Sequence, residues 1–284
     1  DALPEAAHRH GILAYPYVNY TAFPTYGIRT KTWEWSLDFM RVPPDDPSAR
    51  EVIDGHRTIV HGPMIGDEEL EPFAEEHPEY WSLTRDKRAA LEPGERRCMS
   101  LAFPEVRADH IRKFLRALHA SPAADGIQVE FVLGNEDADR AATYGYEDAV
   151  TGPFRQRYGR NPFDIPNTDP EWLAFRATYV TAFLRELRDA VKRSRPDASF
   201  TTTMIAGEPD DYIKVLQDWP EWVAQGIVDE LYVWWCTNAD LRSLERQVAH
   251  VAGAVGDKCP VIAELSCYHP GSFQEPDSLL EAAK

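Results

Sequence analysis

Two glutamates stand at comparable places in two short, mainly apolar segments. Asp125-Gly-Ile-Gln-Val-Glu130-Phe alternates apolar and polar residues, and in Pro260-Val-Ile-Ala-Glu264-Leu the same period of two separates Val261, Ala263 and Leu265 from Glu264. In a β-strand this alternation puts Glu130 and Glu264 on the face opposite the apolar side chains. Each glutamate lies four residues after the start of its predicted strand, at residue 126 or 260, so we expect both carboxyls near the same edge of a sheet.

Two carboxyls supplied by different strands are what cleavage of a glycosidic bond requires. One protonates the leaving oxygen, and the other attacks the anomeric carbon or activates a water molecule. The acid must be protonated near neutral pH, so its pKa must lie above the ordinary value of a carboxyl. Burial and a neighbouring second carboxylate both raise the pKa of a carboxyl. The same two groups could instead pair with Arg or Lys and only hold the layers of a barrel together.

A further acid, Glu136, follows Asn135 just beyond the first of these segments. An Asn-Glu pair after a strand is the acid signature of many retaining glycosidases, so Glu136 is the reserve acid and Asn135 a candidate sugar ligand. The acids of this stretch could equally form a solvated turn or a weak calcium loop, although the D-x-D-x-D-G order is missing. These acids are Glu130, Glu136, Asp137, Asp139 and Glu147.

Aromatic and polar residues gather where the predicted strands end, which suits a sugar because its C–H faces pack on rings. The predicted sugar-binding residues are Tyr17, Asn19, Asn135, Tyr232, Trp234, Trp235 and His269. Trp172, Trp219 and Trp222 fall at helical positions and are expected in the core, whereas Trp33 and Trp35 suit either role. His8 and His10 are expected at the surface.

Composition excludes several classes of function. The chain has 284 residues, 43% of them hydrophobic, and a formal net charge of −17, which disfavours binding to nucleic acid or to anionic membranes. It has no G-x-G-x-x-G, G-x-x-x-x-G-K, G-x-S-x-G or H-E-x-x-H motif and no zinc spacing of cysteines. We therefore expect no cofactor and no metal; oligomeric state is not predictable.

Short apolar runs alternate with amphipathic segments, which indicates βα units around a parallel sheet. The predicted strands are 11–19, 126–132, 199–205, 228–235 and 260–265, and the predicted helices are 6–10, 108–119, 171–193, 212–224 and 241–255. Because polar residues collect at the strand ends and no Gly-rich turn follows a strand, a TIM (β/α)8 barrel is favoured over an open nucleotide-binding sheet.

Five strands are fewer than the eight of such a barrel. Further strands are possible within 57–65 or 97–103, but we expect that the chain begins after the first barrel strands and stops before the last. Residues 1–284 are predicted to form one barrel domain, with 20–95 as an inserted excursion over the carboxyl-end rim of the strands. Cys236 and Cys267 could form a disulfide or remain buried thiols.

Several stretches carry a family resemblance, covering about residues 76–265. They are Leu101-Ala-Phe-Pro-Glu-Val-Arg107, Asp125-Gly-Ile-Gln-Val-Glu-Phe131, Gly145-Tyr-Glu-Asp-Ala-Val150, Phe154-Arg-Gln-Arg-Tyr-Gly159, Trp172-Leu-Ala-Phe-Arg176 and Tyr179-Val-Thr-Ala-Phe-Leu-Arg-Glu-Leu-Arg188. With them the chain resembles bacterial glycoside-hydrolase-like proteins of the family-10-like group. The resemblance implies a TIM barrel, often exported, that acts on a polysaccharide or glycoconjugate.

Under this resemblance, Glu130 lies on the fourth barrel strand, Tyr232 on the sixth and Glu264 on the seventh. That arrangement implies that Glu130 is the acid/base and Glu264 the nucleophile of a retaining glycosidase. Relatives tend to carry Asp at the position of Glu130, so the role or the geometry can differ here. The partner expected is a carbohydrate, and the expected location is secreted or periplasmic.

Two other functions remain open at this point. A non-catalytic carbohydrate-binding barrel would keep the aromatic rim but would need no paired carboxyls. A lyase acting on an acidic polysaccharide would need Arg or Lys and a Tyr or His base at the rim, and the acidic net charge argues against it.

Overall fold

A parallel sheet of five strands forms the centre of the protein. The computed structural model describes residues 2–19, 28–29, 51–53, 56–58, 69–70, 72–89, 99–130, 142–205, 211–236 and 241–265. All five predicted strands are present and stand in the order β1-β6-β7-β8-β9. Their bounds are β1 Tyr17–Asn19, β6 Gly126–Glu130, β7 Ser199–Ile205, β8 Glu230–Cys236 and β9 Val261–Leu265.

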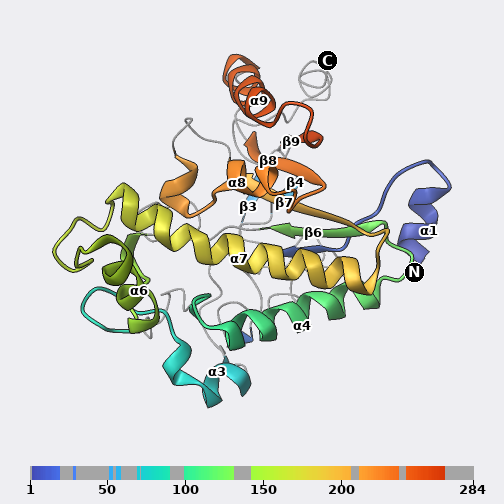
Figure 1. Ribbon diagram of the computed structural model, residues 1–284. Helices are drawn as coiled ribbons and strands as arrows, with labels where there is room; N and C mark the ends of the chain where they lie inside the picture. Colours follow the sequence, from blue (N-terminus) through green and yellow to red (C-terminus); the bar gives the residue numbers. More distant parts are fainter. Residues whose placement is uncertain are drawn as a thin grey trace.

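Helices connect these strands and cover one face of the sheet. In Figure 1, α4 and α7 lie side by side across β6, α6 lies near the start of α7, and α9 lies beside β9. The helices are α1 Ala2–His8, α3 Pro72–Glu76, α4 Pro104–Ala120, α6 Asp148–Tyr158, α7 Pro170–Ser194, α8 Trp219–Ala224 and α9 Leu241–Val255. Parallel strands with covering helices confirm the predicted α/β class. Within the described residues the five strands do not close into a ring, because β1 and β9 each pair on one side only.

The predicted helix over 212–224 is wrong as a single element. The structure has a 3-10 turn, η3 Tyr212–Val215, and the separate helix α8. Leu216 has a positive φ of 62°, which ends the turn, and Pro220 lies in the first turn of α8, where its missing N–H leaves no helical hydrogen bond unmade.

Between β1 and α4 the described residues form small antiparallel pairs. β2 Ile28–Arg29 pairs with β5 Glu69–Leu70, and β3 Glu51–Ile53 pairs with β4 His56–Thr58. α3 and the 3-10 turn η2 Pro78–Tyr80 follow. Of the two ranges in which further barrel strands were possible, 57–58 belong to the β3–β4 pair and 99–103 make one bridge, from Met99 to Trp81, whereas 59–65 and 97–98 lie outside the described residues.

The core lies between the sheet and the helices α4 and α7. Ile127 and Val129 of β6 and Phe200 of β7 are fully buried there against Phe114 and Phe183 of the two helices. Burial of a side chain of this size stabilises the fold by about 1.5–3 kcal/mol. The alternation in β6 therefore has its apolar face toward the helices, as predicted. Trp172, Trp219 and Trp222 are buried, which confirms their core assignment.

Gly126 lets β6 and β7 approach each other at the start of their pairing. A Cβ at this position would lie 2.2 Å from the carbonyl oxygen of Ser199, a contact that no other residue type can make without moving the backbone. Any larger residue here would push the two strands apart, and with them the rows of residues further along the sheet.

Candidate functional site

One row of paired residues crosses the sheet where β6 ends. Backbone pairing puts Glu130 in register with Asn19 of β1 and Thr203 of β7, and Thr203 in register with Tyr232 of β8. Paired residues of neighbouring strands lie about 4.8 Å apart and on the same face of a sheet. Three residues predicted from sequence as site residues, Asn19, Glu130 and Tyr232, therefore occupy one row.

On β6, β7 and β8, the described residues of the face away from α4 and α7 are polar, whereas β9 adds Ile262 to this face. Gln128 donates from Nε2 to Oγ1 of Thr203 at 3.1 Å, which links β6 to β7 one row below Glu130. The hydroxyl of Tyr232 donates to Oε2 of Glu230 at 3.4 Å on β8. Barrel interiors are usually filled by Val, Ile and Leu, so this face has an unusual number of groups that can hydrogen-bond.

Glu264 lies on β9, two residues beyond Ile262, the register partner of Tyr232. Here β8 contains one extra residue, because Val233 pairs with Ala263 whereas Cys236 pairs with Leu265. Two consecutive tryptophans, Trp234 and Trp235, thus stand opposite the single residue Glu264. Such bulges recur beside active sites, where they change the direction in which a strand presents its side chains.

The structure places the other predicted site residues as follows. Tyr17 is in β1, in register with Gln128 of β6. The structure describes the side chain of Tyr232. It describes only the backbone of the other predicted site residues in the strands, which are Tyr17, Asn19, Glu130, Trp234, Trp235 and Glu264. Asn135, Glu136, His269, Trp33, Trp35 and Cys267 lie outside the described residues, so these predictions and that of the Cys236–Cys267 disulfide stand as they were.

Glu147, assigned from sequence to a solvated or calcium-binding stretch, is instead buried. Its carboxylate accepts bonds from the hydroxyl of Ser100, from Leu83 N–H at 3.0 Å and from the hydroxyl of Ser82 at 3.4 Å. Protein donors surround this carboxylate, so it ties the chain around residues 82–100 to the start of α6. The described residues contain no group of three or more His, Cys, Asp or Glu suited to a metal ion.

The threonines of β7 were not among the residues predicted from the sequence. Thr201, Thr202 and Thr203 are at most 1% exposed, yet they form a polar layer in the middle of the sheet. The run Ser199-Phe-Thr-Thr-Thr203 was visible as a strand, and its uninterrupted hydroxyls were the available signal. Three buried hydroxyls in one strand require hydrogen-bond partners, and these tie β7 to β6.

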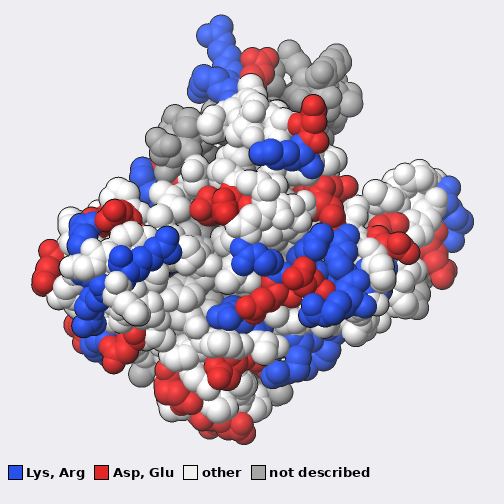
Figure 2. Space-filling view, viewed as in Figure 1, with Lys and Arg blue, Asp and Glu red and all other residues white. Residues whose placement is uncertain are grey.

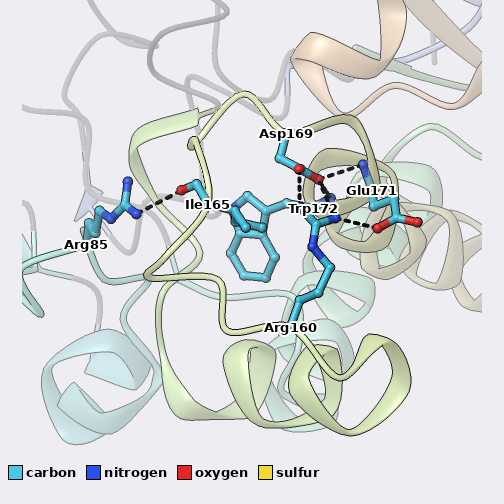
Figure 3. A network of polar contacts seen from close by, with 6 residues as sticks. All are labelled: Arg85, Arg160, Ile165, Asp169, Glu171 and Trp172. Carbon is cyan, nitrogen blue, oxygen red and sulfur yellow. Dashed lines mark hydrogen bonds and ion pairs between the residues drawn. The ribbon is translucent and has the colours of Figure 1, made fainter.

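An ion cluster holds the loop before α7 (Figure 3). Asp169 accepts bonds from Arg160 at 2.6 Å and from the N–H groups of Glu171 and Trp172 at 3.0 and 3.1 Å. Burial alone would raise the pKa of Asp169, but these bonds outweigh it and keep the pKa below its ordinary value. Arg160 also pairs with Glu171, and Arg85 donates to the carbonyl of Ile165 at 2.8 Å.

The arrangement can present carboxyls, hydroxyls and aromatic residues along one edge of a parallel sheet. In βα barrels this edge carries the active site, because the loops after the strands are free to vary while the strands hold the side chains in place. Within the described residues, no helix has both the length and the apolar composition to cross a membrane.

Comparisons with known proteins agree with this geometry. The sequence profile of the family glycosyl hydrolase-like 10 matches residues 62–252. The β-galactosidase from Rahnella sp. R3 is 17% identical over 99% of this chain and 40% of that chain, with a TM-score of 0.52. The β-galactosidase from the psychrophilic Marinomonas ef1 is 17% identical over 85% of this chain and 38% of that chain, with a TM-score of 0.46.

The chain thus spans about two fifths of the length of these two solved structures. The likeness to the Rahnella structure supports the predicted TIM-barrel fold, of which the described sheet is a part. A search of curated proteins found no match.

Proposed function

Because the chain belongs to the glycosyl hydrolase-like 10 family, we propose that it is a glycoside hydrolase that cleaves O-glycosidic bonds of a poly- or oligosaccharide. Glu264 is the nucleophile and Glu130 the acid/base, with Glu136 as the alternative acid. The observation that carries this proposal is the register of the sheet. Glu130 is in register with Thr203 at the carboxyl end of β6, and Glu264 stands between Ala263 and Leu265 near the carboxyl end of β9, which supports a position for both glutamates at the same edge of the sheet.

The mechanism proceeds in two steps. Glu264 attacks the anomeric carbon while the protonated carboxyl of Glu130 gives its proton to the leaving oxygen, forming a covalent glycosyl-enzyme. Glu130, now ionised, takes a proton from water, and that water displaces Glu264 from the sugar. The anomeric carbon is inverted twice, so its configuration is retained.

The row across the sheet also supplies groups that would bind the sugar. Asn19 and Tyr232 flank Glu130 and Thr203 in register, and Trp234 and Trp235 stand beside Glu264. Aromatic rings and amide groups in this combination bind pyranoses through their C–H faces and hydroxyls. His269 and Asn135, in the segments that follow β9 and β6, are further candidates. Because a polymer of sugars does not cross membranes, we also propose that the protein is secreted or periplasmic.

The test is digestion of a library of glycans with analysis of the products, followed by substitution of the two glutamates. We expect Glu264→Gln and Glu130→Gln to lower kcat/KM by about 10²–10⁴-fold with unchanged thermal unfolding, because each removes a group that acts in the transition state. Glu245→Gln, on the exposed face of α9, is the matched control and should keep full activity.

Azide separates the two roles. With a substrate that has a good leaving group, azide should restore turnover to Glu264→Ala with inverted product and to Glu130→Ala with retained product. Unaltered activity in Glu264→Gln would remove this residue from the mechanism. Binding of a glycan without turnover by the unsubstituted protein would favour a carbohydrate-binding barrel instead.

A further inference from the structure

Two segments far apart in the chain meet around the ring of Phe163. They are residues 82–89, which form a hairpin, and residues 146–165, which include α6. Nζ of Lys87, from the hairpin, lies 5.2 Å from the centre of the Phe163 ring, and Cζ of Arg155, from α6, lies 6.0 Å from it. Cations from both segments thus lie close to one aromatic side chain, which is half-buried.

Arg85 of the hairpin adds a third cation. Its Nη2 donates to the carbonyl of Phe163 and, at 2.8 Å, to the carbonyl of Ile165 (Figure 3). Its Cζ lies 5.9 Å from the centre of the Tyr146 ring, and the rings of Tyr146 and Phe163 are 5.4 Å apart. These groups form one surface, which we call the Phe163 surface and which consists of Arg85, Lys87, Arg155 and Phe163.

The three cations of this surface differ in their partners. Lys87 pairs with Asp148 at 2.7 Å. The bonds of Arg85 go to backbone carbonyls, and those of Arg155 go to the carbonyl and the hydroxyl of Thr151 on its own helix. Both arginines are exposed, and within the described residues neither forms an ion pair. Their two positive charges are therefore available to an anion from solution.

The charge balance of the two segments is opposite to that of the chain. Together, residues 82–89 and 146–165 contain six Lys or Arg and four Asp or Glu, whereas the whole chain contains 30 and 47. Of the four acids, Glu147 is buried among hydrogen-bond donors and Asp148 is paired with Lys87. The Phe163 surface thus attracts anions although the protein as a whole repels them.

A guanidinium beside an aromatic ring suits a sugar that carries an acidic group. Arginine binds a carboxylate through two parallel N–H bonds, and the bonds of Arg85 within the described residues engage only Nη2. The ring of Phe163 adds an apolar surface for the C–H groups of a pyranose. An inorganic anion would use the cations alone, whereas a charged saccharide uses the cations and the ring.

We propose that the Phe163 surface binds an acidic saccharide, with Arg85 and Arg155 holding its carboxylate or sulfate groups and Phe163 packing against a sugar ring. This inference rests on the proposed function for the class of substrate, and it specifies that substrate as a glycan with anionic groups. Part of the surface belongs to the connection between β6 and α7, and in βα barrels the connections after strands border the active site.

The experiment is isothermal titration calorimetry of the whole chain with three hexasaccharides: an oligogalacturonate, a sulfated galactan and a neutral galactan. At low ionic strength we expect at least one acidic ligand to bind about tenfold more tightly than the neutral one, since two ion pairs are gained. This difference should shrink as salt is added, because salt screens exposed charges. The stronger of the two acidic ligands identifies the anion as carboxylate or sulfate.

Substitutions then locate the binding surface. Arg85→Gln combined with Arg155→Gln should lower the affinity for the acidic ligand about tenfold and leave that for the neutral ligand unchanged. Arg85→Lys keeps the charge but not the two parallel bonds, so it should lose less. Arg116→Gln is the matched control, because it removes one exposed charge from the C-terminal half of α4 and should change neither affinity.

Arg155→Gln alone protects the test against misfolding. Arg85 also holds residues 163–165, whereas the bonds of Arg155 lie within α6, so this single variant should fold normally and still bind the acidic ligand about threefold more weakly. Thermal unfolding checks the fold of each variant.

Several results would overturn the proposal. They are equal binding of acidic and neutral saccharides, an equal loss in Arg116→Gln, and binding of hexaglutamate as tight as that of the acidic saccharide, which would mean that the surface recognises charge alone. None of these measurements needs turnover. An acidic glycan that is bound through the arginines but not cleaved supports the surface and contradicts the hydrolase, whereas cleavage of neutral glycans without acidic binding contradicts the surface and supports the hydrolase.

Discussion

His110 is a histidine enclosed between α4 and α7. It is fully buried, with its ring 6.2 Å from that of Phe183, and its Nδ1 lies 3.7 Å from Oδ2 of Asp109. Burial lowers its pKa below the ordinary value, and the charge of Lys113 acts in the same direction against the opposing effect of Asp109. His110 is therefore neutral in the folded protein near neutral pH.

This gives the folded protein a sensitivity to mild acid. An unfolded histidine takes up a proton near pH 6.5 while folded His110 does not, so the free energy of unfolding falls as the pH drops below that value. One such group contributes a slope of at most about 1.4 kcal/mol per pH unit. We expect His110→Gln to lose this part of the pH dependence between pH 7 and 5, measured by urea unfolding.

His119→Gln is the control for that measurement, because His119 lies on the same helix but is exposed and bonds the hydroxyl of Ser194 at 2.7 Å. It should unfold with the pH dependence of the unsubstituted protein. Asp109 does not interfere in this range. Burial would raise its pKa, but the neighbouring His110 and the ion pair with Lys113 at 2.7 Å hold it well below the ordinary value, so the stability it contributes is lost only in stronger acid. The same slope in all three proteins would contradict a neutral His110.

At the scale of elements, the start of α7 depends on one side chain. Asp169 caps the helix through the N–H groups of Glu171 and Trp172, and Pro170 follows it at the first helical position. This order, Asp before Pro, is a strong helix start, and it agrees with the predicted beginning at residue 171. The cap therefore fixes the point at which the chain turns from the loop after α6 into α7.

Removal of the cap should destabilise the protein measurably. Asp169→Ala leaves two N–H groups without their partner and Arg160 without its more buried ion pair, so we expect the free energy of unfolding to fall by about 1–2 kcal/mol in urea. Glu171→Gln removes only an exposed ion pair with Arg160 and should change stability by less than about 1 kcal/mol. Equal losses in the two variants would mean that the ion pair, not the cap, holds the loop.

The strands and helices were predicted correctly where one local sequence pattern determines the secondary structure. The strands 126–132, 199–205 and 260–265 were found from short apolar runs, and the long helix over 171–193 from its four-residue spacing of aromatic residues. It failed at 212–224, where the left-handed Leu216 divides the segment. It also missed α6, whose apolar pattern is weak and which contains Pro153. In both cases packing against the rest of the protein outweighs local propensity.

At the scale of the molecule, the net charge of the chain does not predict the charge of any one face. The chain carries −17, yet Figure 2 shows Lys and Arg gathered over the C-terminal halves of α4 and α7 with acidic side chains between them. Several are paired: Arg112 with Asp109 at 2.8 Å, and Lys192 with Asp229 at 2.8 Å. Basic residues near helix C-termini also complement the helix dipole, so this face is explained by the fold itself.

The candidate site could be predicted from sequence as a set of residues but not as a geometry. The alternation along β6 was enough to assign Glu130 to the same face as Gln128, and the alternation along β9 was enough to assign Glu264 to the face opposite Ala263. The register that aligns Asn19, Glu130, Thr203 and Tyr232 depends on pairing between segments far apart in the chain, as does the extra residue in β8 opposite Glu264. A single sequence carries no signal for such long-range pairing.

The curvature of the whole sheet decides the stereochemistry of the proposed reaction. β6 and β9 are three strand intervals apart, which is about 14 Å along the sheet. Retention needs the two carboxyls about 5–5.5 Å apart and inversion about 6.5–9.5 Å, so the sheet must curl around its polar face and both side chains must reach inward. Strands tilted as in a TIM barrel produce this curl.

We expect the first product released to keep the anomeric configuration of the substrate, observed by ¹H NMR of the reaction within its first minutes, before mutarotation. The assignment of Glu264 as nucleophile requires this result, because a carboxyl that attacks the sugar must lie close to the acid. A product of inverted configuration would place the carboxyls further apart, with a water molecule between Glu264 and the sugar. Glu264 would then act as a general base on a more open sheet, and azide would no longer give a retained product with Glu130→Ala.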